Sequence, residues 1–188
     1  MFSGIIETQA KILAIDAGRL SVENTFSDTL QIGQSIAHDW ACMTIESFDE
    51  HQYSFFAMAE SFDKTNFWNK QVGESFNVER CLKIGDRVDG HFVTGHVDTI
   101  GTVALFEQNS DESWRLGIAF DESYSKYVID KGSITINGTS LTIVWRAPWY
   151  LEVCIIPLTL EVTNLWKLVT SDRVNLEFDM LWKYILNK

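Results

Sequence analysis

The two halves of this chain repeat one another. Three separate blocks align at a common offset of 98 residues, without a gap: residues 35–45 with 133–143, 65–68 with 163–166, and 77–79 with 175–177. Upstream, residues 3–7 align with 94–98 at an offset of 91, which places seven extra residues in the first hairpin of the second copy. Blocks that share one offset indicate an internal duplication, so both copies are expected to adopt the same fold.

Each copy has the pattern of a small β structure. Residues 133–136 and 140–143 alternate polar and apolar side chains with period two, and the Asn137-Gly138 pair between them favours a tight hairpin turn. Segments 53–56 and 151–156 are rich in residues that favour strands. About six short strands in a copy of about 90 residues indicate a closed barrel.

The expected fold is therefore all-β: two tandem six-stranded Greek-key-like β-barrels related by internal duplication, with a short C-terminal helix. The first domain is predicted at residues 1–86 and the second at 87–188. The C-terminal helix is predicted from the apolar spacing after Met180, and short helical turns are predicted at 121–127 and 25–29.

Composition excludes several classes of partner. The formal net charge of −11 argues against a nucleic-acid partner, which selects for basic surfaces. No apolar run approaches the roughly 20 residues of a membrane-spanning helix. The three cysteines, Cys42, Cys81 and Cys154, are isolated, so reduced thiols in a cytoplasmic protein are expected, rather than disulfides or a metal site.

Five motifs in order on a duplicated barrel make the chain similar to the riboflavin synthase family over essentially its whole length. They are residues 1–7, 90–98, 131–142, 156–165 and 174–177. The resemblance implies that each barrel binds one 6,7-dimethyl-8-ribityllumazine. One lumazine then transfers a four-carbon unit to the other, which yields riboflavin and 5-amino-6-ribitylaminopyrimidinedione. It implies no metal, flavin or nicotinamide cofactor.

The chemistry of that reaction sets what the residues must do. A proton leaves an acidic methyl group, a nucleophile adds at the adjacent carbon, and N–H donors stabilise the delocalised anions. Alignment of two bound substrates can supply roughly 7–11 kcal/mol of the barrier. The resemblance also implies a homotrimer in which the first barrel of one subunit meets the second barrel of another.

The resemblance carries the family's site residues over to two sets of positions. Catalytic roles are expected for Phe2, Ser35, Cys42, His96, Ser140, Thr142 and Asp179. In this expectation, Cys42 and Phe2 come from the partner subunit. Substrate contacts in the first barrel are expected from Gly4, Ile5, Ile6, Cys42, Met43, Thr44, Phe56, Ala57, Met58, Ala59, Glu60 and Ser61. Those in the second barrel are expected from His91, Gly95, His96, Val97, Lys131, Ser140, Leu141, Thr142, Ile155, Ile156, Pro157, Leu158, Thr159 and Leu160.

Each of these residue types also has a structural explanation when it is taken alone. Ser35, Thr44 and Thr142 could be ordinary strand residues, and Cys42 a small buried hydrophobe. The histidines could be bonded to barrel backbone, Asp179 could cap the final helix, and Lys131 could be a solvated charge. Only their joint placement in one pattern favours a functional role.

The first copy departs from the pattern at its turn, where Asp39-Trp40 replaces Asn137-Gly138. A type I′ turn needs positive φ at both central residues, which Trp tolerates badly, so a different turn is expected there. The second barrel, which is the more regular copy, is expected to bind ligand more tightly. The alternative function is a non-catalytic relative that binds lumazine or a flavin as a fluorophore, and a generic barrel module is a third possibility.

The C-terminal helix bears on assembly. From Met180 to Lys188 it would span only about 13 Å at 1.5 Å per residue. Its apolar side chains bury a small area, which must offset the entropy lost on association. The expectation from the sequence is a homotrimer that is weaker than is typical of the family.

Overall fold

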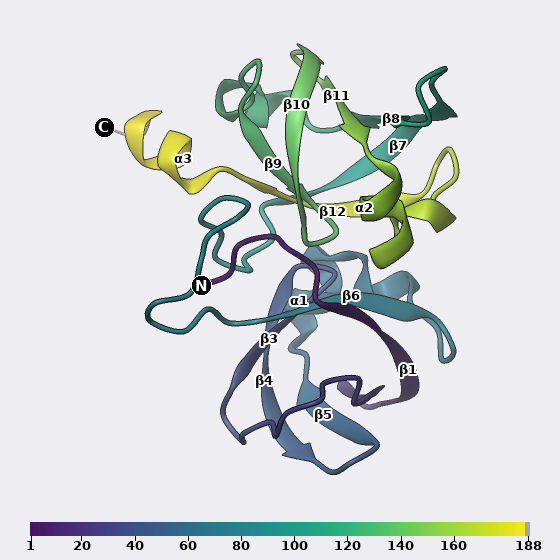
Figure 1. The fold of residues 1–188 in the computed structure, drawn as a ribbon, viewed down its shortest axis with the longest axis vertical. Helices are drawn as coiled ribbons and strands as arrows, with labels where there is room; N and C mark the ends of the chain where they lie inside the picture. Colours follow the sequence, from purple (N-terminus) through teal and green to yellow (C-terminus); the bar gives the residue numbers. More distant parts are fainter. Residues whose placement is uncertain (187–188) are drawn as a thin grey trace.

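The computed structural model describes residues 1–186. It contains two closed six-stranded antiparallel barrels, one above the other in Figure 1, with a short helix that projects at the C-terminal end. Neighbouring strands follow the order β1-β2-β5-β4-β3-β6 in the first barrel, and β7-β8-β11-β10-β9-β12 around the second. The fold class predicted from the sequence is confirmed.

The first barrel comprises β1 (Thr8–Asp16), β2 (Arg19–Glu23), β3 (Ser35–His38), β4 (Ala41–Phe48), β5 (Gln52–Phe56), α1 (Ala59–Lys64), η1 (Asn66–Asn69) and β6 (Ser75–Arg80). The second comprises β7 (Thr99–Gln108), β8 (Trp114–Ala119), η2 (Glu122–Tyr127), β9 (Ser133–Ile136), β10 (Thr139–Ala147), β11 (Tyr150–Ile155), α2 (Pro157–Val162), η3 (Asn164–Lys167) and β12 (Arg173–Phe178). The final helix is α3 (Met180–Leu186), so the part of the predicted helix at residues 187–188 lies outside the described residues.

The helices were predicted only in part. The final helix and the short turn at η2 are confirmed, but residues 25–29 form no helix. Helices α1 and α2 each span only six residues and bury no side chain, so they leave no apolar stripe at helical spacing in the sequence. Within residues 1–186, no helix is long and apolar enough to cross a membrane.

In both barrels, side chains along a strand alternate between the interior and the surface, and the inward-facing ones fill the core. In β10, for example, Leu141 and Ile143 point inward and are buried while Thr142 between them is exposed. The extra residues of the second copy lie largely in the β7–β8 hairpin, since Val103 pairs with Ile118 whereas Ile12 pairs with Val22.

The turn between β3 and β4 does not have the different conformation that was expected from the sequence. Asp39 and Trp40 have φ of 40° and 90°, close to the 45° and 87° of Asn137 and Gly138, so both copies make the same kind of turn. The expectation of a different turn was wrong because the side chains make tertiary contacts that compensate for the strain. Trp40 is fully buried, and the Asp39 carboxylate accepts a hydrogen bond from the backbone N–H of Asn77 at 2.8 Å.

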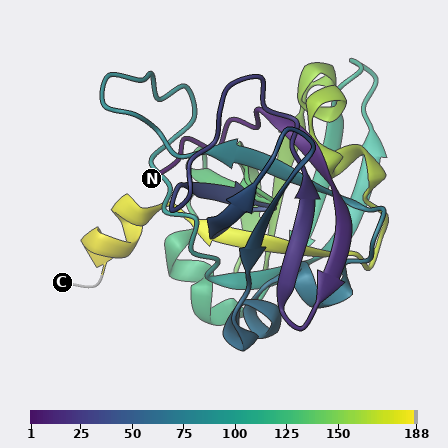
Figure 2. The same ribbon diagram turned by 90° about the horizontal axis from the view of Figure 1, so that it is seen from below.

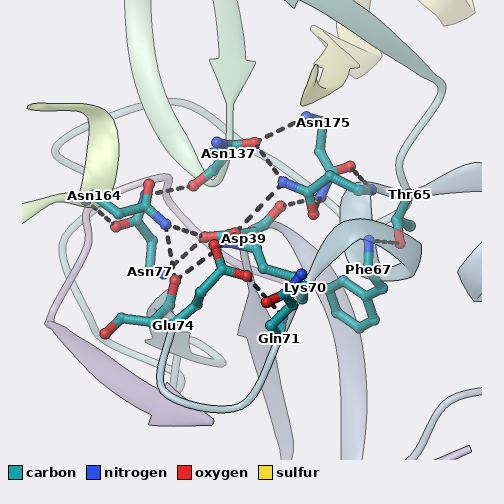
Figure 3. Close-up of polar contacts among 12 residues, drawn as sticks. Asp39, Thr65, Phe67, Lys70, Gln71, Glu74, Asn77, Asn137, Asn164 and Asn175 are labelled. Atoms are coloured by element: carbon teal, nitrogen blue, oxygen red, sulfur yellow. Dashed lines mark hydrogen bonds and ion pairs between the residues drawn. The ribbon is translucent and has the colours of Figure 1, made fainter. Parts of the chain in front are cut away.

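Asparagine side chains join the two barrels in a pseudo-symmetric network (Figure 3). The backbone N–H of Asn66 donates to Oδ1 of Asn175 at 2.7 Å, and that of Asn164 donates to Oδ1 of Asn77 at 2.6 Å. Both bonds cross from one barrel to the other, and their partners are related by the offset of 98 residues. The repeated blocks 65–68 and 77–79 therefore form part of the surface on which the two barrels meet.

Candidate functional site

The segment that precedes the first strand of each barrel lies against the other barrel. We call these two segments, residues 3–6 before β1 and residues 94–97 before β7, the leading segments. The carbonyl of Gly4 accepts a hydrogen bond from the backbone N–H of Ser140 at 2.8 Å, and the carbonyl of Gly95 accepts one from Cys42 at 2.9 Å. A Cβ atom on Gly4 would lie 2.6 Å from that of Ser140, and one on Gly95 would lie 2.7 Å from that of Cys42. Both glycines also have positive φ, so this close approach requires glycine.

Because each leading segment lies against the other barrel, an arrangement that we call the exchange of leading segments, the predicted site residues group differently in space. From the sequence we expected Gly4–Ile6 to lie with Cys42–Thr44 in the first barrel, and Gly95–Val97 with Ser140–Thr142 in the second. In the structure each leading segment instead borders β4 or β10 of the opposite barrel, and we call these two strands the pocket strands. We call the neighbourhood of Cys42–Thr44 and Gly95–Val97 the Cys42 site, and that of Ser140–Thr142 and Gly4–Ile6 the Ser140 site.

The Ser140 site contains a serine bonded to a histidine. Nδ1 of His91 lies 2.7 Å from Oγ of Ser140, and its Nε2 lies 3.3 Å from Oγ1 of Thr135. Burial lowers the pKa of His91, although the negative charges of Asp179 and Glu177 partly oppose this effect. His91 is therefore neutral at pH 7, and a neutral imidazole beside a hydroxyl is suited to accept its proton.

The Cys42 site has a different character. Burial raises the pKa of the Cys42 thiol, and a hydrogen bond with Ser35 lowers it in part. The group is therefore a protonated thiol at neutral pH, which is a weak nucleophile. Ser140 occupies the equivalent position in the second copy, and its partner there is His91.

Exposed apolar side chains follow β5 and β11, next to the pocket strands. Met58 is 61% exposed and its counterpart Ile156 is 56% exposed, while Thr44 and Thr142 are exposed on the pocket strands themselves. The other predicted contact residues of the first barrel lie at the end of β5, in the link to α1 and in α1 itself. Those of the second barrel lie at the end of β11 and in α2. Such surfaces suit a planar ring with an attached polar chain.

Two buried glutamates hold the leading segments in place, and sequence reasoning did not predict this role. Glu79 accepts from the backbone N–H groups of Ser3 at 2.7 Å and Gly4 at 2.9 Å. Glu177 accepts from Thr94 at 2.8 Å and from Gly95 at 3.0 Å. The duplicated blocks 77–79 and 175–177 contain both glutamates, but in the sequence alone these blocks indicate only the repeat.

The remaining predicted residues are placed as follows. Asp179 caps α3, because its Oδ1 accepts from the backbone N–H of Leu181 at 2.9 Å. Phe2 is fully buried, with its ring centroid 5.8 Å from that of Trp40. Lys131 is exposed at a φ of 63°. Its backbone N–H donates to the carbonyl of Ile143, the residue that follows Thr142 on β10. His96 is exposed beside Gly95.

A surface cleft of about 800 Å³ lies beside Ser3 and Ile5. Its other walls come from the segment between β2 and β3, from the end of β6 and from the connection between the barrels, including Arg80 and Lys83. Among residues 1–186, no group of three or more His, Cys, Asp or Glu side chains is arranged to hold a metal ion.

Comparison with known proteins places this arrangement in a family. The model of the lumazine binding domain matches twice, at residues 3–81 and 94–179. The riboflavin synthase of Mycobacterium tuberculosis (strain H37Rv) is 34% identical, with 98% of this chain and 96% of that protein covered. The riboflavin synthase of Escherichia coli K12 is 35% identical over 95% of this chain and 87% of that protein, and that of Bacillus subtilis is 30% identical over 98% and 88%.

Solved structures support the same fold. LumP complexed with riboflavin aligns with a TM-score of 0.85 at 20% sequence identity, over 95% of this chain and 99% of that chain. LumP complexed with 6,7-dimethyl-8-(1'-D-ribityl) lumazine aligns with a TM-score of 0.81 at 19% identity, over the same shares of the two chains. Because the family model matches both barrels and the relatives span nearly the whole chain, this chain belongs to the lumazine-binding domain family.

Proposed function

We propose that the chain is a riboflavin synthase, which converts two molecules of 6,7-dimethyl-8-ribityllumazine to riboflavin and 5-amino-6-ribitylaminopyrimidinedione. The observation that carries this proposal is the His91–Ser140 pair at 2.7 Å, placed beside the segment that crosses from the other barrel. The proposal is also supported by the relatives, which are named riboflavin synthases and are 30–35% identical to this chain.

The geometry assigns different roles to the two sites: chemistry to the Ser140 site and binding of the second substrate to the Cys42 site. At the Ser140 site, His91 takes the hydroxyl proton of Ser140 as that oxygen adds to the ring carbon beside the methyl group of one lumazine. At the Cys42 site, the second lumazine is held against β4 and the Gly95–Val97 segment. The reaction then depends on bringing the two bound rings together in one orientation.

Turnover distinguishes the enzyme from a fluorophore carrier. Incubation of the protein with 6,7-dimethyl-8-ribityllumazine is expected to produce the absorbance of riboflavin. Tight binding without turnover would instead favour a carrier, a function suggested by the ligand-bound LumP structures. Failure to bind either compound would contradict both functions.

The role of Ser140 in turnover can be tested by replacing it. We expect Ser140→Ala to lower kcat about a hundredfold, because general acid–base chemistry typically contributes roughly 10²–10⁴-fold. The melting temperature should change little, since Ser140 is only partly buried. The matched control is Ser110→Ala, which makes the same change at an exposed serine after the end of β7 and should leave kcat unaltered. Equal rates for the two variants would remove Ser140 from the mechanism.

We also propose that the protein is a cytoplasmic homotrimer whose active site is shared between subunits. Support comes from α3, where Leu181 and Ile185 are each 54% exposed and thus available for contact with another copy. Light scattering and specific activity measured together on dilution test this. Activity should fall as the oligomer dissociates, and a monomer with undiminished specific activity would contradict the shared site.

The proposed domains are residues 1–86 and 87–188, as expected from the sequence. This division is supported by the strand ladders, which close each barrel within its own half of the chain. An isolated bridge between Phe2 and Val93 crosses the division, and it belongs to the exchange of leading segments described above.

A further inference from the structure

The turn between β3 and β4 differs chemically from its counterpart between β9 and β10. Trp40 occupies the position that corresponds to Gly138, and it is fully buried. A Cβ atom on Gly138 would lie 3.3 Å from Cε3 of Trp40 and 3.4 Å from its backbone N. The Trp40 side chain therefore packs against the second turn, and the interface holds an indole ring on one side with glycine opposite.

The indole of Trp40 reaches the second barrel. Its Nε1–H donates a hydrogen bond to Oε2 of Glu177, on β12. The same carboxylate oxygen accepts from the backbone N–H groups of Gly95 and His96, each at 3.0 Å. Oε1 of Glu177 accepts from the backbone N–H of Thr94 at 2.8 Å. One side chain of the first barrel thus fixes the carboxylate that holds residues 94–96.

A second contact joins the same partners. Two residues after Trp40, the backbone N–H of Cys42 donates to the carbonyl of Gly95 at 2.9 Å. The start of β4 is therefore tied to residues 94–96 twice: directly by its backbone, and through Glu177 by the Trp40 indole. Because Glu177 is completely buried, its charge depends on these donors rather than on water.

On the opposite side of the interface the backbone bond from Ser140 to Gly4 is kept, but no side chain of the turn between β9 and β10 donates to Glu79. Glu79 accepts from the backbone N–H of Ser3 at 2.7 Å, from its Oγ at 2.8 Å, and from the backbone N–H of Gly4 at 2.9 Å. The turn residue that corresponds to Trp40 is Gly138, which has no side chain to donate. The pseudo-symmetry of the two sites is therefore broken at the turn residue, because Trp40 donates to the glutamate that holds residues 94–96 whereas Gly138 cannot donate to Glu79.

We propose that Trp40 is a positioning residue for the Cys42 site: its indole N–H fixes Glu177, and Glu177 fixes Gly95 and His96 at the border of that site. This inference rests on the proposed function, since it takes a lumazine or riboflavin as the ligand there. Loss of the indole N–H removes one donor from a buried carboxylate, which then moves together with residues 94–96. The Ser140 site is anchored through Glu79 and keeps its affinity.

The test uses Trp40→Phe in the full chain, since phenylalanine keeps a buried aromatic ring but cannot donate. Riboflavin is titrated while the amide NMR signals of His96 and Ile5 report on the two sites separately. We expect the dissociation constant at the Cys42 site to rise about tenfold, as befits one lost hydrogen bond to a charged group, with the Ser140 site unchanged. Trp149→Phe, at an exposed tryptophan, is the matched control and should alter neither site.

A purely structural role would give a different pattern. A lower melting temperature with unchanged dissociation constants at both sites, or with equal weakening at both, overturns the proposal. Hydrogen exchange without ligand adds a readout that does not depend on binding. In Trp40→Phe the amides of Thr94, Gly95 and His96 should exchange at least tenfold faster, while those of Ser3 and Gly4 should not.

The two measurements also separate this proposal from the proposed function. If the wild-type protein binds neither riboflavin nor lumazine, the proposed function is wrong. Faster exchange confined to residues 94–96 would then still support the positioning of that segment by Trp40. Unchanged exchange in the variant overturns the positioning role whatever the wild-type protein binds.

Discussion

Acidification from pH 6.5 towards pH 4 is expected to destabilise the protein through His38, by about 1.4 kcal/mol for each pH unit. The His38 side chain is fully buried in the first barrel, with Nε2 2.8 Å from the hydroxyl of Tyr53 and Nδ1 3.1 Å from the carbonyl of Ile36. Burial lowers its pKa to about 3, and the bond to Ile36 opposes this shift only in part.

The direction of the change in stability follows from the protonation of His38 in the folded and unfolded states. Between pH 3 and 6.5 the imidazole is neutral in the folded protein but protonated in the unfolded chain, so the unfolded state binds more protons. The stability contributed by His38 is therefore complete above pH 6.5 and is lost progressively as the pH falls towards 3. Urea unfolding at a series of pH values measures this loss.

The second barrel supplies the matched variant for this experiment. Ile136 and Leu151 occupy the positions that correspond to His38 and Tyr53, and both are fully buried. The double variant His38→Ile, Tyr53→Leu should therefore keep a packed core and lose the steep dependence on pH. His51→Gln, at an exposed histidine, should retain the wild-type slope. If the double variant showed the wild-type slope, His38 would not be the group responsible.

Lys70→Leu is expected to lower the free energy of unfolding by about 3–5 kcal/mol, because it leaves a buried carboxylate without its cation. Nζ of Lys70 lies 2.7 Å from Oδ2 of Asp39, whose side chain is 0% exposed. Figure 3 shows this pair within the polar network between the barrels. The Asp39 carboxylate keeps hydrogen bonds from the Asn77 backbone at 2.8 Å and from Nδ2 of Asn164 at 2.7 Å, but both donors are neutral.

A double-mutant cycle separates the charge from the packing. The second copy has Asn137 and Leu168 at the positions of Asp39 and Lys70, so Asp39→Asn, Lys70→Leu makes the first copy resemble it. We expect the double variant to recover most of the stability lost in Lys70→Leu. Lys64→Leu removes a cation from an exposed ion pair with Glu60 and should have little effect. A double variant no more stable than Lys70→Leu would contradict the pairing argument.

The sequence predicted the barrels because duplication gives the same constraint twice. Period-two alternation at 133–136 and 140–143 identifies strands, and the common offset transfers that assignment to the less regular first copy. The candidate site residues also came from the sequence, through the resemblance of ordered motifs. These signals are local, or they compare one stretch of the chain with another.

Contacts between the copies were not predicted. Figure 2, which views the barrels from below, shows the N-terminal segment and the connection between the barrels beside one another. No periodicity within one copy indicates that Gly4 meets Ser140 or that Gly95 meets Cys42, since these pairs are formed between copies. For the same reason the roles of Glu79 and Glu177 were missed, although their repetition was visible.

By itself, then, the sequence determined the duplicated all-β architecture, the approximate number of strands in each barrel and the set of candidate site residues. The tertiary structure decided which of those residues become neighbours, and it allowed Asp39 and Trp40 to adopt the positive φ values of an Asn-Gly turn. The physical reason is the same in both cases. Local propensities are worth about 1 kcal/mol per residue, and a buried ring or a buried, fully bonded carboxylate at the barrel interface outweighs them.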